Sequence, residues 1–119
     1  MLEPKDYCNI ETIEALQSIG IEVNTDAQIS LYEAQRLLRD KLRIFVEIPL
    51  IAYMSHFNPS VPNYKIRISM SECPITHDSL IAYVRKEDGT CHEFIEYEEA
   101  LQFGIKSACN SYKAMLEYK

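Results

Sequence analysis

Apolar residues recur at helical spacing near the start of the chain. The first expected helix covers roughly 10–19, and its apolar stripe consists of Ile10, Ile13, Leu16 and Ile19. Asn9 stands directly before it and is expected to act as the N-cap. Gly20 follows where a left-handed residue commonly ends a helix, with Ile21 placed to pack back on Leu16. We therefore predict a short, well-delimited amphipathic helix.

A second helix is predicted to begin near Leu31. Ser30 and Glu33 have the spacing of a capping box, in which the serine hydroxyl caps the amide three residues later. Its expected buried stripe is Ala34, Leu37, Leu38 and Leu42. The segment thus resembles the first helix, with one apolar and one polar face.

After Arg43 the period changes from helical to alternating, which predicts strands. The first covers about 44–50, and Pro49, which has no amide donor, places that end at a sheet edge or a bulge. A loop is expected over 55–63. The second strand covers about 64–70, with Ile66 and Ile68 on its buried face. Strands over about 79–86 and 91–97 are expected to form a hairpin around the turn at 87–90.

The last segment predicts a long closing helix. Its apolar face is expected to contain Leu101, Gly104, Ile105, Ala108, Tyr112 and Met115. Gly104 disfavours a helix interior by about 1 kcal/mol relative to Ala, so we expect a close approach of helix and sheet there. The fold class is α+β: helices packed on one face of a three- to four-stranded antiparallel sheet, in the order α-α-β-β-β-β-α, as a single domain over 1–119.

Charge limits the expected partners. The 119 residues carry a formal net charge of -6, which disfavours non-specific binding to nucleic acid or to an anionic membrane. A strand running into a closing helix also ends the double-stranded-RNA-binding domain, whose topology this order allows. That domain needs cations at the start of the helix, whereas this helix opens with Glu98 and Glu99. We expect it to cover the sheet, with no role in gripping phosphate.

The four cysteines are widely spaced, and no apolar run approaches the roughly 18 residues that a membrane span needs. The first residues resemble neither part of a signal peptide. We expect a protein of a reducing cytosol, with free thiols and no membrane partner.

Two pairs of cysteine and histidine are candidates for a zinc site or for a reactive thiolate. Cys73 and His77 are four residues apart, but adjacent Cys91 and His92 would point to opposite faces of a strand. No glycine-rich turn accompanies the Cys73 and His77 pair, and glycine-rich phosphate loops are missing from the sequence. We expect a protein without catalytic activity, metal or cofactor.

The outer face of the sheet offers an alternative function. Alternation would place five aromatic and basic residues there: Phe45, Lys65, Arg67, Tyr83 and Arg85. Tyr53 shares that parity, and His92 or Phe94 would join from the fourth strand. Bases can stack on such a surface, so nucleic-acid binding is the alternative to a protein partner.

Two features favour contact with a protein. The segment after the first strand has more apolar residues than one face can bury. Either the loop expected over 55–63 covers it, or it forms a docking edge or a homodimer contact through Ile51, Tyr53, Met54 and Phe57. Carboxylates gather near the last helix: Glu93, Glu96, Glu98 and Glu99. They form either a solvated face or an imitation of nucleic acid that occupies a basic groove.

Three motifs stand out: a first helix ending in Gly20-Ile21, a second that contains Ala34-Gln35, Leu38-Arg39 and Lys41, and a closing "YEEAL-xx-GI" from Tyr97. With these motifs the chain resembles a family of short uncharacterised proteins encoded by phages and mobile elements of gut Bacteroidales. The chain departs from the pattern at Leu42-Arg43, where the family commonly has Gly, and at Glu96, where it has Thr or Ser. The resemblance implies an origin and an architecture, and no chemistry transfers with it. For an acidic protein of that origin we expect, by analogy, an accessory role in which it binds a host protein, for example as an anti-defence or anti-CRISPR inhibitor.

Overall fold

Three α-helices, one 3-10 turn and three strands make up the part of the chain that the computed structural model describes, residues 2–24, 28–50 and 63–118. In chain order these are η1 (Pro4–Asp6), α1 (Ile10–Ser18), α2 (Leu31–Leu42), β1 (Ile44–Glu47), β2 (Arg67–Met70), β3 (Leu80–Tyr83) and α3 (Tyr97–Tyr118). The predicted α+β class is confirmed, whereas the predicted order with four strands is wrong by one strand.

The ends of α1 have the expected chemistry. The Asn9 side chain accepts a hydrogen bond of 2.9 Å from the Thr12 amide. Gly20 has a φ of 88°, its amide donates to the Gln17 carbonyl, and the Ile21 amide donates to the Leu16 carbonyl. These two bonds define a Schellman ending, so both predicted boundaries of α1 are confirmed within one residue.

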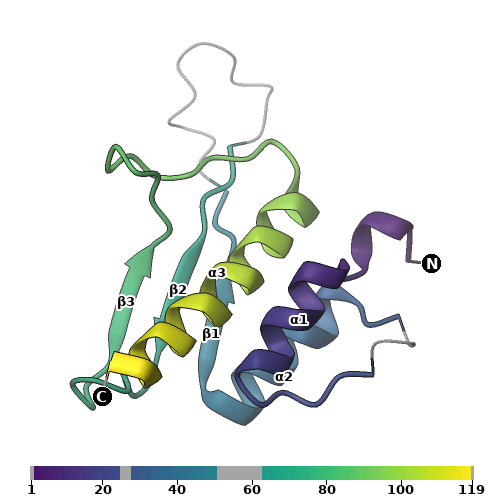
Figure 1. Cartoon of the computed structure of the whole chain (residues 1–119). Coiled ribbons are helices and arrows are strands. Elements are labelled where there is room, and N and C mark those ends of the chain that lie inside the picture. Colours follow the sequence, from purple (N-terminus) through teal and green to yellow (C-terminus); the bar gives the residue numbers. More distant parts are fainter. Residues whose placement is uncertain (1, 25–27, 51–62, 119) are drawn as a thin grey trace.

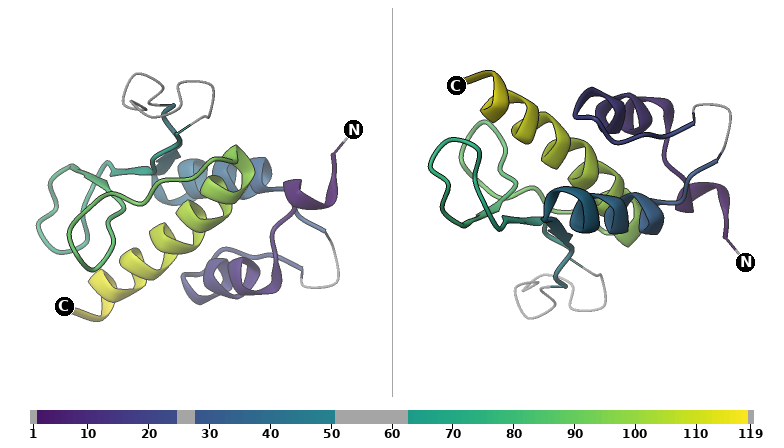
Figure 2. Two further views of the ribbon diagram at one scale, coloured as in Figure 1. Left: turned by 90° about the horizontal axis from the view of Figure 1, so that it is seen from above. Right: turned by 90° about the horizontal axis from the view of Figure 1, so that it is seen from below.

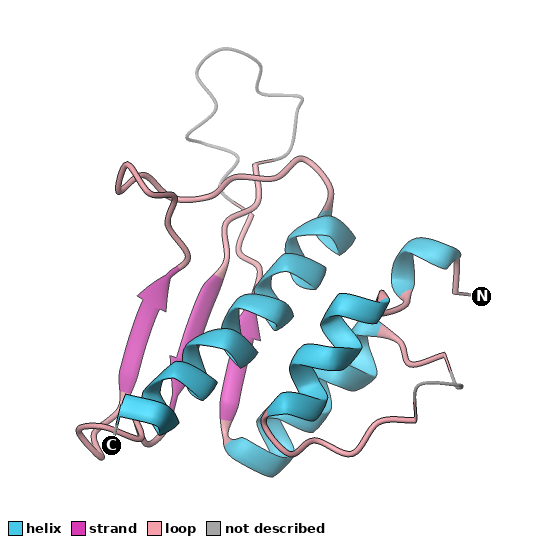
Figure 3. Ribbon diagram, viewed as in Figure 1, coloured by secondary structure: helices cyan, strands magenta, loops and turns pink. Residues whose placement is uncertain are grey.

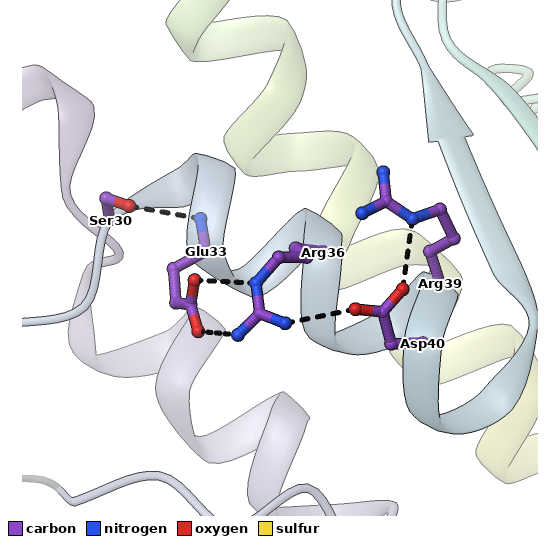
Figure 4. A network of polar contacts seen from close by, with 5 residues as sticks. All are labelled: Ser30, Glu33, Arg36, Arg39 and Asp40. Atoms are coloured by element: carbon purple, nitrogen blue, oxygen red, sulfur yellow. Dashed lines mark hydrogen bonds and ion pairs between the residues drawn. The ribbon is translucent and has the colours of Figure 1, made fainter.

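Helix α2 has a network of polar contacts on its exposed face (Figure 4). Ser30 caps the Glu33 amide at 3.0 Å, and the Arg36 guanidinium bridges Glu33 and Asp40 along one side of the helix. Hydrogen bonding to Arg36 lowers the pKa of Glu33, and hydrogen bonding to Arg39 and Arg36 lowers that of Asp40. The acids of this helix are therefore already paired with its own cations.

The three strands form an antiparallel sheet in the order β1-β2-β3 (Figures 1 and 3). Val46, Ile68 and Ala82 lie side by side across it on the face toward α3. Helix α3 crosses that face against β1 and β2, and α2 packs beside β1, where the Gln35 amide donates to the Val46 carbonyl. Both views of Figure 2 show α1 and α2 next to α3. A side chain of α2 thus protects the edge of β1.

The prediction of a fourth strand is wrong, because the residues after the hairpin pair with the same strand of the sheet as β3 does and continue its path. The register of β3 on β2 would place Lys86 opposite Tyr64, but Phe94, eight residues later, pairs with Tyr64 through two backbone hydrogen bonds of 2.8 and 2.9 Å. Within the hairpin, the Lys86 amide donates to the Thr90 carbonyl, and the His92 amide donates to the Val84 carbonyl. Residues 85–92 are therefore a hairpin inserted into one strand path.

Pro49 interrupts the ladder between the first two strands. Leu50 pairs with Tyr64 in the same register as β1 with β2, so there is no bulge. The Lys65 amide donates to the Pro49 carbonyl, but proline has no amide to return the bond. β1 is an edge strand, as expected, and it ends at Glu47 for this reason.

The core lies between the sheet and the three helices, with α3 against β1 and β2. Ile66 is fully buried and Ile68 is 8% exposed, which confirms the predicted inner face of β2. A Cβ built on Gly104 would stand 2.8 Å from Ile66 Cγ2 and 2.9 Å from Val46 Cγ1. Glycine therefore permits the close approach that the sequence predicted. No helix in the described residues is both long and apolar enough to cross a bilayer.

Candidate functional site

A hollow of about 380 Å³ lies where the start of α3 meets η1 and α1, and we call it the α3 hollow. Its lining combines carboxylates, two lysines and two phenylalanines: Lys5, Asn9, Thr12, Phe94, Glu96, Glu98, Glu99, Gln102, Phe103 and Lys106. Three of the four acids predicted from the sequence as partner-binding residues converge here, and Glu93 lies outside the lining.

Polar side chains hold α1 and its preceding segment against α3. The Gln102 side chain accepts from the Asn9 amide at 2.9 Å and donates to the Tyr7 carbonyl at 3.2 Å. Lys106 forms an ion pair of 3.0 Å with Glu11. These contacts join residues more than ninety positions apart, so the hollow exists only in the folded chain.

The carboxylates of the hollow differ in their partners. Glu98 is the most enclosed, with 21% of its side chain exposed, and lies 3.7 Å from Lys5 Nζ. Glu96 and Glu99 are exposed and have no ion pair among the described residues, and the same holds for Glu93. Two carboxylates of the hollow, Glu96 and Glu99, are therefore without an ion pair and can meet an incoming cation.

The elements around the hollow carry the whole net charge of the protein. Residues 2–20 and 93–106 contain eight acidic and two basic side chains, a balance of -6 that equals the formal charge of the chain. Both of those lysines line the hollow, and each is already paired with a glutamate. The rest of the sequence is balanced, so the electrostatic field is strongest on this side.

Aromatic rings form one wall of the hollow. The ring centroids of Phe94 and Phe103 lie 5.5 Å apart, and the His92 ring lies 4.6 Å from that of Phe103 at an interplanar angle of 44°. Thr12 of the lining is fully buried, and its hydroxyl oxygen has no hydrogen-bond partner among the described residues. Rings beside carboxylates suit a cationic group with an apolar stem, such as arginine or lysine.

The outer face of the sheet is less basic than the sequence suggested. Phe45, Lys65, Arg67 and Tyr83 occupy its outward positions and are each partly buried. Arg67, however, pairs with Glu47 at 3.0 Å and hydrogen-bonds Tyr83, and these contacts raise its pKa. The register places Glu47 directly across from Arg67, so an acid that alternation also put on this face neutralises its central cation.

Other residues expected on the outer face lie elsewhere. The prediction for His92 and Phe94 is wrong, because both pack against Phe103 of α3 on the helix side. Because the hairpin is inserted into the strand path, the side chains of His92 and Phe94 point to the face of the sheet that α3 covers, and not to the outer face. Arg85 is exposed, and its guanidinium donates to the Gly89 carbonyl within the hairpin at 2.9 Å.

The cysteines and histidines are held at opposite ends of β3. Cys73 and His77 lie in the loop before β3, while Cys91 and His92 follow it in the hairpin. His77 contacts Glu72 at 3.2 Å, and the Cys73 sulfur lies 3.9 Å from that of Met115. Backbone amides of Thr76 and Ile75 lower the pKa of Cys73. Among the described residues no group of three potential metal ligands is found.

Part of the predicted interface falls outside the described residues. Ile51, Tyr53, Met54 and Phe57 all belong to 51–62, and their contribution to a docking edge or dimer stays a prediction. The loop expected over 55–63 falls almost wholly in the same segment.

Searches against protein-family models, curated proteins and solved structures found no significant match to this chain. The resemblance to the phage proteins is therefore untested by these comparisons, and the site rests on its geometry. Sequence reasoning missed Lys5, Gln102, Phe103 and Lys106. An aromatic ring at 103, just off the apolar stripe of α3, was the one signal that a second contact lay there.

Proposed function

We propose that this protein acts by binding another protein through the α3 hollow, without catalysis. The partner presents an arginine or lysine from a basic surface, which enters between the glutamates and the phenylalanine rings. The observation that carries the proposal is the convergence of Glu96, Glu98 and Glu99 on one hollow, on the side that holds the net charge.

The origin implied by the motif resemblance sets the class of partner. For a protein carried by a phage or mobile element, the partner is a host protein with a basic, nucleic-acid-binding groove. Carboxylates spaced along the start of α3 would occupy that groove as an anti-defence inhibitor does. This step depends on the resemblance, and the hollow itself supports only the chemistry of the contact.

Nucleic-acid binding through the outer face is the second proposal. Four of its five residues share that face of the sheet, which supports it. Pairing of Arg67 with Glu47 weighs against it, because it neutralises the central cation of that face. Affinity for single strands that falls steeply with salt and is lost in Lys65→Ala with Arg67→Ala would favour this second proposal.

Differential capture from a host lysate tests the first proposal. The test variant is Glu96→Gln, Glu98→Gln and Glu99→Gln, which removes three charges from the hollow and keeps side-chain size. The matched control is Glu22→Gln, Glu87→Gln and Glu117→Gln, which removes three charges from exposed residues outside the hollow.

We expect the unmodified protein and the control to capture the same host protein, and the test variant to lose it. Equal loss in both variants would indicate a general effect of charge. Full retention by the test variant would contradict a role for the hollow.

A further inference from the structure

β3 has an open edge. The Val84 amide donates to the Ile66 carbonyl, so Val84 and alternate residues before it direct their backbone groups toward β2. Ile81 and Tyr83 therefore direct theirs away from the sheet. Among the described residues nothing pairs with them, and Figures 1 and 3 show β3 at the free margin of the sheet.

The edge lacks the usual protection. Residues 80–84 read Leu-Ile-Ala-Tyr-Val, without a charge, a proline or a bulge, and Ile81 is 68% exposed. The opposite edge differs, because Gln35 of α2 caps the Val46 carbonyl of β1. A neutral, β-branched edge strand is a template for a further strand.

We propose that the added strand is β3 of a second copy of this chain, which pairs antiparallel about a two-fold axis at Ala82. In that register Ile81 faces Tyr83 of the other copy, and the two outward-directed residues exchange both backbone hydrogen bonds. The dyad repeats the exchange, so four backbone bonds form and the three-stranded sheets join into one of six strands. Each Ile81 to Tyr83 contact is a β-branched residue against an aromatic ring, a favourable cross-strand pair.

Charges at the two ends of the strand are compatible with an antiparallel pair. The two-fold axis brings the hairpin that follows β3 in one copy toward the loop that precedes β3 in the other. Lys86 of that hairpin and Asp78 of that loop are both exposed and have opposite charges. A parallel arrangement would instead bring each of these two residues toward its own copy and place like charges together.

The inner side of the same strand also favours a second copy. A groove of about 430 Å³ separates β3 from α3, and its apolar lining includes Leu80, Ala82, Val84 and Met115. The two-fold axis at Ala82 brings the grooves of the two copies together and sets Leu80 beside Val84 across the new strand pair. The surface is therefore complementary to itself on both faces of the sheet.

Sedimentation equilibrium and NMR test the proposal on the full chain. We expect the mass to move from monomer toward dimer between micromolar and millimolar concentrations. In a mixture of isotope-labelled and unlabelled protein, the Ala82 Hα should contact the same proton of the other copy, since Cα atoms of such a pair lie roughly 4.5 Å apart.

Ile81→Pro removes an outward amide donor from each copy and should abolish the dimer, whereas Ile81→Thr keeps the amide and should retain it. A monomer at every concentration would overturn the proposal. So would a dimer of the unmodified chain without the Ala82 contact, whether or not the proline variant folds.

Discussion

At the residue scale, Gly104 is the position where the closest packing can be tested. Replacing it with Ala gains about 1 kcal/mol of helix propensity but forces a methyl group against Ile66 and Val46, which costs about 1–3 kcal/mol. We expect Gly104→Ala to lower the free energy of unfolding by about 1 kcal/mol, measured by urea denaturation. Asn110→Ala, at an exposed position of α3, is the control and should stabilise slightly. A clear gain at 104 would contradict the contact.

Arg43 is a position where glycine should stabilise the protein, because this residue ends α2 with a φ of 57°. A left-handed conformation costs an L-residue about 1–2 kcal/mol, and glycine avoids this cost. Part of that gain is offset, because glycine loses more conformational entropy on folding. Arg43→Gly should therefore raise the free energy of unfolding by up to about 1 kcal/mol, while Lys41→Gly, inside α2, should lower it by a similar amount. Destabilisation by Arg43→Gly would mean that its side chain, not its backbone, matters.

Single residues were the most predictable level of this structure. Asn9, Ser30 and Gly20 act through hydrogen bonds within a few positions of the chain, so their roles follow from local sequence. Gly104 was predictable for another reason: an unfavourable residue in a strongly patterned helix needs a tertiary explanation. The pairing of Glu47 with Arg67 was not predictable, because it depends on the register between β1 and β2.

At the element scale, the inserted hairpin makes a prediction about register. Deleting residues 85–92 would join Val84 to Glu93 and leave Phe94 opposite Tyr64 in one unbroken strand. We expect this chain to fold with its closing helix in place, at a cost of about 2 kcal/mol or less, since a shorter loop offsets part of the lost contacts. Circular dichroism and urea denaturation measure the outcome.

The control is a deletion one residue shorter, 86–92. It would move Phe94 by one position and turn its ring from α3 to the outer face. We expect this variant to be far less stable than the eight-residue deletion. Equal stability of the two would show that Phe94 does not continue the path of β3.

The fourth strand was predicted wrongly for a physical reason. Residues 91–97 have enough apolar and β-branched character for a strand, and the turn at 87–90 gives a hairpin, as expected. Local pattern does not reveal which neighbour a strand will take. The Val84 carbonyl accepts from His92 on the β2 side, which directs the returning arm into the line of β3.

At the scale of the whole molecule, the half-buried thiol of Cys8 and the buried thiol of Cys109 predict a loss of stability at alkaline pH. Burial raises the pKa of Cys8 to about 11 and that of Cys109 to about 12, from an ordinary value of 9.0. Their contribution to the free energy of unfolding is complete below pH 9.0, because the thiols are then protonated in both the folded and the unfolded chain. It is lost as the pH rises from 9.0 toward the pKa values of the folded chain. The free energy of unfolding should fall by up to about 1.4 kcal/mol per pH unit for each thiol.

Cys109→Ala provides the comparison. It removes one of these two thiols while all other titrating groups stay, so the difference between the two pH profiles isolates that thiol. We expect a shallower fall for the variant above pH 9.0 in urea titrations. Parallel profiles would show that Cys109 titrates normally in the folded chain.

The candidate site shows where sequence reasoning stops. Glu96, Glu98 and Glu99 could be selected because they are close in sequence, and local charge density needs no fold. Lys5 and Lys106 could not be selected from the sequence, because only the packing of η1 and α1 against α3 brings them to the same hollow. Contacts between distant segments decide which acids are free, and those contacts appear only in three dimensions.

The most direct test of the central claim is an NMR titration of the protein with a short arginine-rich peptide, followed at every backbone amide. Binding through the α3 hollow predicts shifts centred on Phe94, Gln102 and Phe103, which are lost when Glu96, Glu98 and Glu99 are changed to Gln. Shifts centred instead on Phe45, Lys65 and Tyr83, or no response to the peptide, would contradict the account.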